Sequence, residues 1–578
     1  MAGGSSSSNH KPRRAALGLA LAGLTCVALG VVVVLVAPWL IKDQVSKHLV
    51  LKPDTIIFKM WKDIPVPFYF SVYMFEVLNS KDVLKGAKPE LAQRGPFVYR
   101  ENRSKRNITF NENGTVSFLE QKWFHFCPDL SNGSEQDYVV VPNLLVLGAA
   151  MMLADQSFAM KMMVSAALAT FQQTAFINRT VSDILWGYKD PFLDFVNAVK
   201  PGLLPFKDKF GLLVQLNNSN SGMFTVYTGT DDLSKVHKMD NWNGLTKLPF
   251  WNSDQCNMIN GTSGQMWPPF MTSSTPVEFY SPDACRSMKL EYTHAGNFEG
   301  IPIYRYKFPK TLFANGTDYP PNEGFCPCRQ SGILNVSKCQ QGAPMFISNP
   351  HFFNADPSLL EGVGGLRPNE SAHETLIDLN PLTGIPMSCT VKLQLNIFTK
   401  QVTGIIQTGR IKPVVLPVIW FEETGKIDGD LLSEFYTFVV MIPLLVEYGQ
   451  YCFLALGGVF LVVATLLALK SMTPVLEWQG PVAIRTLSVT KFLNRGQLQK
   501  YQGPQGKSFF FLWRSNKGED PKEAIEASKR KEILKEIRLD AQQEGLLPKP
   551  DQWNRPPQHS GLDTAPLLQE GSNTANHT

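Results

Sequence analysis

The chain has 578 residues, of which 44% are hydrophobic and 18% charged, and its formal net charge is +5. This composition fits either several soluble domains or one large domain with membrane spans, and we expect no nucleic-acid partner. Residues 15–41 carry no charge over 27 positions, which exceeds the roughly 20 residues that a helix needs to cross a bilayer. A cleaved signal peptide has an apolar core of only about 7–15 residues, so we expect a membrane span here.

A second uncharged run extends from Tyr451 to Leu469. Basic residues flank the outer ends of both runs, a bias that marks cytosolic segments. These residues are Lys11, Arg13 and Arg14 before the first run and Lys470, Lys491, Arg495 and Lys500 after the second. We therefore expect a double-pass membrane protein with cytosolic segments at 1–14 and 470–578 and spans at 15–41 and 449–469. Residues 42–448 would form an extracellular or lumenal domain.

Glycosylation sequons agree with this topology. Ten Asn-x-Ser/Thr acceptors lie in the middle segment, where the enzymes of the secretory pathway could reach them, and Asn576 is the only acceptor elsewhere. We expect Asn576 to stay unmodified. The ten acceptors are Asn102, Asn107, Asn113, Asn132, Asn178, Asn217, Asn260, Asn315, Asn335 and Asn369.

Cysteine placement points to the same compartment. Seven of the nine cysteines lie in the middle segment, whereas Cys26 and Cys452 lie in or beside the spans. This asymmetry indicates disulfides in an oxidising environment. Seven is an odd number, and Cys127 lies apart from the other six. A zinc site at Cys326 and Cys328 is disfavoured because no second close pair or nearby His completes four ligands; we expect no metal and no other cofactor.

The sequence pattern of the middle segment predicts mostly strands. Short runs rich in β-branched or aromatic residues are bounded by Gly, Pro or Asn, which predicts a large, mainly antiparallel barrel or sandwich. These runs include Phe97 to Tyr99, Thr115 to Leu119, Tyr138 to Val141, Phe224 to Tyr227 and Val391 to Phe398.

One helical segment, from Leu144 to Phe171, interrupts the strands. Its apolar residues recur at the spacing of a single helix face: Met160, Met163, Val164, Ala167, Leu168 and Phe171. The same segment holds Met151, Met152, Met160, Met162 and Met163. Methionine side chains suit surfaces that adapt to apolar partners, whereas a methionine stripe at helical spacing is more often ordinary core. The core interpretation is favoured, and the docking interpretation is kept as a hypothesis.

The motifs of common enzymes are missing from the sequence. There is no G-x-S-x-G and no H-E-x-x-H, and the Gly506-Lys507-Ser508 triplet has Tyr501 where a P-loop requires its first Gly. We therefore expect no enzyme.

Longer stretches resemble a known family, the class B scavenger receptors, which also include fatty-acid translocase and the lysosomal integral membrane protein. The resemblance covers roughly residues 15–470. It rests on Trp61-Lys-Asp-Ile-Pro-Val-Pro-Phe-Tyr-Phe70, Gln93-Arg-Gly-Pro-Phe-Val-Tyr-Arg-Glu101, Leu185-Trp-Gly-Tyr-Lys-Asp-Pro-Phe192, Trp251-Asn-Ser-Asp-Gln-Cys256, Phe279-Tyr-Ser-Pro-Asp-Ala-Cys285 and Pro320-Pro-Asn-Glu-Gly-Phe-Cys-Pro-Cys328.

The resemblance implies an α+β ectodomain with a β-barrel-like core, a membrane-distal helical bundle at about residues 144–200 and an apolar tunnel towards the bilayer. High-density lipoprotein and its apolipoproteins would dock at the helical apex, at Met160, Lys161, Met162 and Met163. Cholesteryl ester would then pass through the tunnel without uptake of the particle, while free cholesterol could move in either direction. Phospholipids and anionic ligands would also bind, in caveola-like domains of the plasma membrane.

The resemblance also implies a disulfide pattern. Cys285 would pair with Cys339 and Cys326 with Cys328, leaving Cys256 and Cys389 as a third pair. If Cys389 is instead unpaired and near the tunnel, alkylation of its thiol should block lipid transfer more than docking.

The tail and the spans leave several expectations open. Asp563, Leu567 and Leu568 fit the acidic-x-x-x-Leu-Leu spacing that clathrin adaptors bind, within a segment from 548 to 578 that is expected to be disordered. Such a signal would suit a lysosomal or endosomal cargo receptor of the same family. An adhesion receptor and an ecto-enzyme are further alternatives. Small residues of the first span, Gly18, Ala22 and Gly30, could permit close helix packing, in a monomer or a homo-oligomer. The last four residues do not imply binding to a PDZ adaptor.

Overall fold

The computed structural model describes residues 10–53, 55–199, 206, 208–340, 342–472, 499–502 and 508–511. They belong to two units, Met1–Pro474 and Val475–Thr578. In the second unit, β16 (Gln499–Gln502) pairs antiparallel with β17 (Ser508–Phe511). The expected sorting signal at Asp563, Leu567 and Leu568, the acceptor Asn576 and the expected disorder at 548–578 lie outside the described residues.

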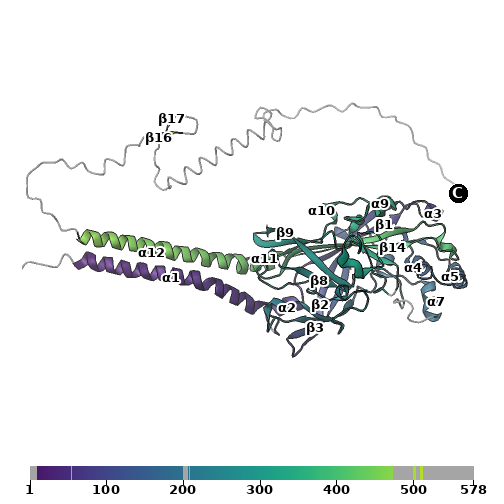
Figure 1. Ribbon diagram of the computed structural model, residues 1–578, viewed down its shortest axis with the longest axis horizontal. Coiled ribbons are helices and arrows are strands. Elements are labelled where there is room, and N and C mark those ends of the chain that lie inside the picture. Colours follow the sequence, from purple (N-terminus) through teal and green to yellow (C-terminus); the bar gives the residue numbers. More distant parts are fainter. Residues whose placement is uncertain are drawn as a thin grey trace, which may run out of the picture. The chain divides into compact units, whose positions relative to one another are not determined.

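Two long helices extend from one end of the first unit (Figure 1). They are α1 (His10–Leu49) and α12 (Ile442–Met472), and α12 follows α11 (Gly429–Tyr436) and a π-helical turn at Thr437–Met441. Both are long and apolar enough to cross a membrane. Each helix is longer than the uncharged run that it contains, because charge ends the apolar run but does not end helical backbone hydrogen bonding.

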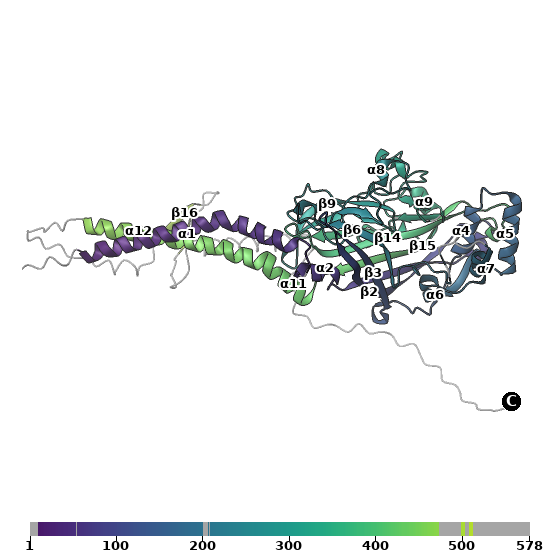
Figure 2. The same cartoon turned by 90° about the horizontal axis from the view of Figure 1, so that it is seen from below.

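The two long helices lie side by side (Figure 2), and they are in contact at glycines. A Cβ atom on Gly457 would lie 2.7 Å from Val27 Cγ2 and 2.9 Å from the carbonyl oxygen of Gly23, and one on Gly30 would meet Leu454. No neighbouring atom lies within 4 Å of a Cβ placed on Gly18, so Gly18 is not part of the contact between these two helices. Ala22 is exposed as well. The interface of these helices therefore lies on the face of Gly23 and Gly30.

Most strands of the first unit join one large sheet whose named strand pairs are all antiparallel, in the order β7-β6-β3-β2-β1-β15-β14-β13-β10-β9-β8. Strand β12 pairs with both β11 and β14, and β4 pairs with β5 in a separate two-stranded sheet. The strands are β1 (Phe68–Val77), β2 (Leu91–Phe110), β3 (Thr115–Phe126), β4 (Tyr138–Pro142), β5 (Phe176–Thr180), β6 (Ser219–Tyr227), β7 (Met239–Trp242), β8 (Val277–Ser281), β9 (Arg286–Phe298), β10 (Ile301–Lys307), β11 (Ile333–Asn335), β12 (Met345–Ser348), β13 (Leu376–Leu379), β14 (Pro386–Thr399) and β15 (Val414–Lys426).

The two edges of this sheet, β7 and β8, meet through the segment around Thr262. The N–H of Met239 donates to the Gly261 carbonyl (2.8 Å), the N–H of Thr262 donates to Glu278 (3.2 Å), and Tyr280 donates to Thr262 (2.8 Å). A Cβ on Gly261 would overlap the Glu278 carbonyl, so the close approach of the two backbones requires glycine. The sheet is therefore nearly barrel-shaped, as expected.

Buried apolar side chains form two large clusters at different parts of the sheet. One cluster gathers residues of β3, β6, β8, β9 and β10, such as Phe118, Phe224 and Tyr280. The other gathers residues of β1, β2 and β15 with residues of β4, β5 and α6 (Val181–Trp186), such as Val72 and Leu416. The shorter helices of the first unit include α2 (Ile56–Lys62), α3 (Ser80–Val83), α8 (Asp254–Asn257), α9 (Pro357–Glu361) and α10 (Glu370–His373).

The helical segment of the sequence is two helices, α4 (Leu144–Met152) and α5 (Phe158–Thr170), followed later by α7 (Pro191–Val199). The predicted helical segment is confirmed, and it divides into two helices because Ser157 starts a new helix, accepting a hydrogen bond from the N–H of Met160. Leu168 of α5, Val146 of α4 and Phe192 of α7 share a small apolar core. The three helices lie at the end of the unit opposite α1 and α12 (Figures 1 and 2).

Candidate functional site

A cavity of about 250 Å³ lies inside the barrel, at the end that leads to the long helices. Three residues of α2, namely Ile57, Met60 and Trp61, form one side, and Leu431 and Phe435 of α11 form another. Because α2 follows α1 and α11 precedes α12 along the chain, the cavity adjoins the bases of both long helices. Further apolar residues line the rest of the wall: Phe68, Phe224, Met266, Trp267, Phe279, Met288, Ile377, Val391, Leu393 and Phe421.

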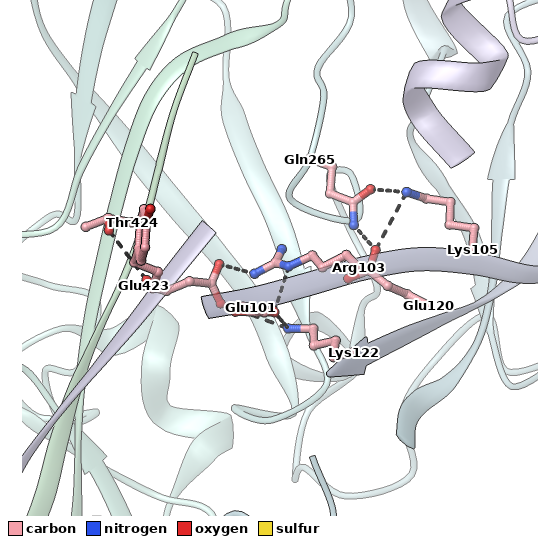
Figure 3. Close-up of polar contacts among 9 residues, drawn as sticks. Glu101, Arg103, Lys105, Glu120, Lys122, Gln265, Glu423 and Thr424 are labelled. Carbon is pink, nitrogen blue, oxygen red and sulfur yellow. Dashed lines mark hydrogen bonds and ion pairs between the residues drawn. The ribbon is translucent and has the colours of Figure 1, made fainter. Parts of the chain in front are cut away.

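A network of ion pairs interrupts this apolar wall (Figure 3). The guanidinium of Arg103 lies 2.7 Å from Glu101 Oε1 and 2.5 Å from Glu423 Oε1, and Lys122 Nζ lies 3.3 Å from Glu101 Oε1. Burial lowers the pKa of Arg103, but the carboxylates of Glu101 and Glu423 outweigh it and raise that pKa overall. Each buried charge is thus compensated by an opposite one, as burial requires.

A second group of polar residues continues the network. Lys105 Nζ donates to the Trp61 carbonyl (2.6 Å) and to Gln265 Oε1 (2.5 Å), and it lies 3.7 Å from Glu120 Oε2. The amide nitrogen of Gln265 also donates to Glu120 (Figure 3). Burial lowers the pKa of Lys105 to about 8, partly offset by Glu120. These contacts join Lys105 of β2 and Glu120 of β3 to the loop after Thr262 and to α2.

Three further polar groups line the cavity without an ion pair among the described residues. Tyr280 is 1% exposed, and its hydroxyl has no hydrogen-bond partner in the described chain. Burial raises the pKa of the Asp283 carboxyl. Cys389 is a free thiol whose pKa rises to about 12, first through burial and then through Glu423. The cavity wall can therefore accept a hydroxyl or another neutral polar group as well as apolar surface.

The structure contains two of the expected disulfides, Cys285–Cys339 and Cys326–Cys328. The expected third pair is wrong, because Cys256 and Cys389 are both free. Cys256 donates from its thiol to the Pro321 carbonyl beside α8, whereas Cys389 lies in β14 against the cavity. Distance along the chain could not reveal that these two cysteines belong to different regions.

The helical apex presents methionines to solvent. Met160, Met162 and Met163 are exposed, Met163 by 62%, while Val164 and Leu168 face the small core. The favoured core interpretation is therefore wrong for these three methionines, because α5 buries its other face, whereas Met151 of α4 packs against the small core. Lys161 is half-buried and its ammonium donates to the carbonyl of Ala154 (3.0 Å), so it braces the turn between α4 and α5.

The ten sequons of the middle segment differ in accessibility. Eight asparagines are exposed, and Asn315 and Asn335 are half-buried. The Asn315 amide donates to the Arg329 carbonyl at 3.4 Å, and Asn335 accepts from Ser337. All ten remain predicted glycosylation sites.

Sequence reasoning missed the charged network, although β2 carries a signal for it. Glu101, Arg103 and Lys105 alternate along the strand and so share one face. Across the strand pair, Arg103 faces Lys122 and Lys105 faces Glu120. Charges repeated at a period of two inside a strand flanked by apolar residues can indicate an internal polar network.

Comparison with known proteins agrees with these features. The CD36 family model matches residues 21–468. Scavenger receptor class B member 1 from Cricetulus griseus is 56% identical over 471 residues, which cover 81% of this chain and 92% of that protein. The protein of the same name from Mus musculus is 56% identical over 479 residues (83% and 93%). Lysosome membrane protein 2 from Homo sapiens is 36% identical over 436 residues (74% and 89%). The chain therefore belongs to the CD36 family and is a class B scavenger receptor rather than an enzyme.

Proposed function

We propose that this chain is a cell-surface receptor for high-density lipoprotein that transfers cholesteryl ester selectively and lets free cholesterol move in both directions. The observation that carries the proposal is the largely apolar cavity beside α2 and α11, at the bases of the two helices that fit membrane spans. A lipid that leaves this cavity at that end would enter the bilayer without crossing water.

The physical advantage of such a path is large. Exposed apolar surface costs about 25 cal/mol per Å² in water, so an ester of low solubility gains from a continuous dry route. At about 250 Å³ the cavity is smaller than the roughly 300–1,000 Å³ pockets of drug-sized ligands. The proposal therefore requires the cavity to widen, and the charged network around Arg103 is the part of the wall that must rearrange.

The helical apex is the proposed docking surface for the particle. Phe158, Met160, Met162 and Met163 expose apolar side chains on α5, at the opposite end of the unit from α1 and α12. Flexible thioether groups can adapt to the irregular surface of an apolipoprotein and its phospholipids. The same surface would serve other lipid-bearing ligands.

The test supplies doubly labelled high-density lipoprotein to cells that express the chain, with one label on cholesteryl ester and one on apolipoprotein. We expect the ester to accumulate in excess of the protein label, beyond the ratio in cells without the chain. Equal entry of both labels would contradict selective transfer and leave whole-particle uptake.

A second candidate is a lysosomal or endosomal cargo receptor. It is supported by the 36% identity to a lysosome membrane protein and by Asp563, Leu567 and Leu568, which have the spacing of an adaptor signal. If this signal acts, changing Leu567 and Leu568 to Ala should raise the surface fraction measured by biotinylation. Equal surface fractions and equal internalisation rates in the variant and the unchanged chain would remove this candidate.

A further inference from the structure

A second cavity, of about 170 Å³, lies apart from the apolar one. Its wall is formed by α8, the start of β9 and the 3₁₀ turn at Pro320–Phe325, and none of its lining residues lines the first cavity. A water molecule occupies about 30 Å³ of liquid volume, so this space can hold more than an isolated water. The residues that line it include Arg286, Cys256, Glu278, Lys289 and Phe325.

The guanidinium of Arg286 lies in the wall of this cavity and is 7% exposed. Nη1 donates to the Leu312 carbonyl (2.9 Å) and Nε makes a long contact with the Ser287 carbonyl (3.4 Å). The ring of Phe325 lies 4.0 Å from the guanidinium carbon. Among the residues that the structure describes, Arg286 makes no ion pair, and Nη2 has no hydrogen-bond partner.

A buried cation without an anion is costly. Removing a charged group from water costs several kcal/mol unless an opposite charge and hydrogen bonds replace the solvent. Burial lowers the pKa of Arg286 to about 10, so the group stays charged at neutral pH. Two carbonyls and one aromatic face supply partial negative charge but no full counter-charge, in contrast to Arg103, which has two carboxylates.

The neighbouring groups do not supply the missing charge. Glu278 lines the same cavity but makes no ion pair with Arg286. Lys289 also lines it and is the cross-strand neighbour of Glu278, so the charges of these two residues offset each other. Asn322 fixes the floor, since its amide donates to the carbonyls of Thr311 and Ala314. The cavity thus contains one buried guanidinium that has unused N–H donors and, among the described residues, no carboxylate paired with it.

We propose that this cavity binds a small soluble oxyanion, a carboxylate or phosphate group, through the free N–H donors of Arg286. The site is separate from the lipid cavity and does not depend on the proposed lipid transfer. A planar guanidinium presents paired donors that match a carboxylate or phosphate oxygen pair. The small volume favours a free anion over a lipid headgroup that carries acyl chains.

Cys256 provides a reporter, because its free thiol lines the same cavity. Iodoacetate and iodoacetamide alkylate thiols by the same displacement, in which the thiolate sulfur bonds to carbon and iodide leaves, but only iodoacetate carries a carboxylate. We expect the ratio of iodoacetate to iodoacetamide rates to be about tenfold higher at Cys256 than at Cys127, measured by mass spectrometry on the full chain in detergent micelles. Cys127, a free cysteine elsewhere in the chain, is the internal control.

Substitutions of Arg286 test whether its positive charge causes the iodoacetate preference at Cys256. Arg286→Gln should abolish the preference at Cys256, whereas Arg286→Lys should retain part of it. Arg329→Gln is the matched control, because Arg329 also lies over a phenylalanine ring, at 3.4 Å from that of Phe398, and lines neither cavity. Equal ratios at Cys256 and Cys127, or a ratio unchanged in Arg286→Gln, would overturn the proposal.

Protection of Cys256 from alkylation by added anions tests the same site in the unchanged chain, without a substitution. Sodium acetate or sodium phosphate, added at constant ionic strength with sodium chloride as reference, should slow alkylation of Cys256 in a saturable way and leave Cys127 unaffected. Protection by chloride alone, or only by vesicles of phosphatidylserine in phosphatidylcholine, would contradict a soluble oxyanion as the ligand.

Discussion

Glu101 shows how strongly a single buried charge depends on its neighbours. Its side chain is fully buried, one carboxylate oxygen contacts both Arg103 and Lys122, and the other oxygen has no hydrogen-bond partner among the described residues. Breaking a buried ion pair by removing one partner costs more than the pair itself contributes, because the remaining charge is left uncompensated.

Glu101→Gln should therefore lower the free energy of unfolding by about 3–5 kcal/mol. Guanidinium denaturation of the full chain in micelles measures the change. The control is Asp82→Asn, which removes the carboxylate of an exposed pair with Lys85 and should cost no more than about 1 kcal/mol. Equal effects of the two substitutions would contradict the assignment of Glu101 as the centre of the network.

Two buried histidines make stability sensitive to acid. The rings of His351 and His373 are stacked 4.4 Å apart. The Nδ1 atoms accept from the N–H groups of Arg367 and Asn369, so His351 carries its proton on Nε2 and donates to Gln93. Burial lowers both pKa values to about 4, with further lowering by His373 for His351 and by Lys392 for His373.

Because these pKa values lie below the usual value near 6.5, the unfolded chain binds more protons than the folded chain between about pH 6.5 and 4. The two neutral histidines therefore stabilise the folded chain fully above pH 6.5, and this contribution is lost as pH falls through about 4. His373→Asn keeps an acceptor for the Asn369 N–H and removes one titrating group, so stability should fall less steeply over this window. Denaturation midpoints measured at several pH values test this prediction. The control is His125→Asn, which replaces an exposed histidine of β3. Identical slopes of stability against pH in the two variants would contradict the prediction.

At the scale of one element, α5 has one face in a core and one in solvent. Replacing Met160, Met162 and Met163 by Glu should weaken lipoprotein binding by about tenfold or more, equivalent to 1.4 kcal/mol. Surface expression should stay normal, because the three side chains are exposed and acidic residues are tolerated near a helix N-terminus.

The matched control for α5 places three Glu residues at exposed leucines elsewhere, Leu78, Leu130 and Leu245. Binding of labelled particles to cells with equal surface expression separates the two triple variants. Unchanged binding by the α5 variant would move the docking surface away from this helix, and an equal loss in both variants would indicate a general effect of charge.

Two adjacent glycines of α12, Gly457 and Gly458, allow the contact between the long helices to be tested with a matched control. A side chain on Gly457 would collide with Val27 and the Gly23 backbone, whereas no neighbouring atom lies within 4 Å of a Cβ on Gly458. Gly457→Leu should therefore lower the thermal denaturation midpoint in micelles, by an overpacking penalty of about 1–3 kcal/mol. Gly458→Leu should have little effect. Equal midpoints for the two variants would contradict the contact between α1 and α12.

For the whole molecule, glycosylation tests on which side of the membrane each segment lies. The eight exposed acceptors between Asn102 and Asn369 should carry glycans, Asn315 and Asn335 should be less occupied, and Asn576 should carry none. Peptide mass spectrometry after enzymatic deglycosylation in heavy water identifies each occupied site. A glycan on Asn576 would show that the tail faces the lumen and would reverse the predicted topology.

The sequence alone determined the features that depend on neighbouring residues. Uncharged runs located the two long helices, and alternating short runs predicted the antiparallel sheet. Two disulfides, Cys285–Cys339 and Cys326–Cys328, followed from resemblance to the family.

Only the tertiary structure decided how distant segments meet. Thr262 bridges the sheet edges, and Lys105 contacts Gln265 from 160 residues away. The methionines of α5 face solvent because the opposite face of this helix packs in the small core with α4 and α7. The same holds for Cys256 and Cys389, which lie in different cavities although the sequence offered them as a pair. Periodicity along a chain reports which residues share a face, but burial, pairing and cavities depend on what the rest of the fold brings against that face.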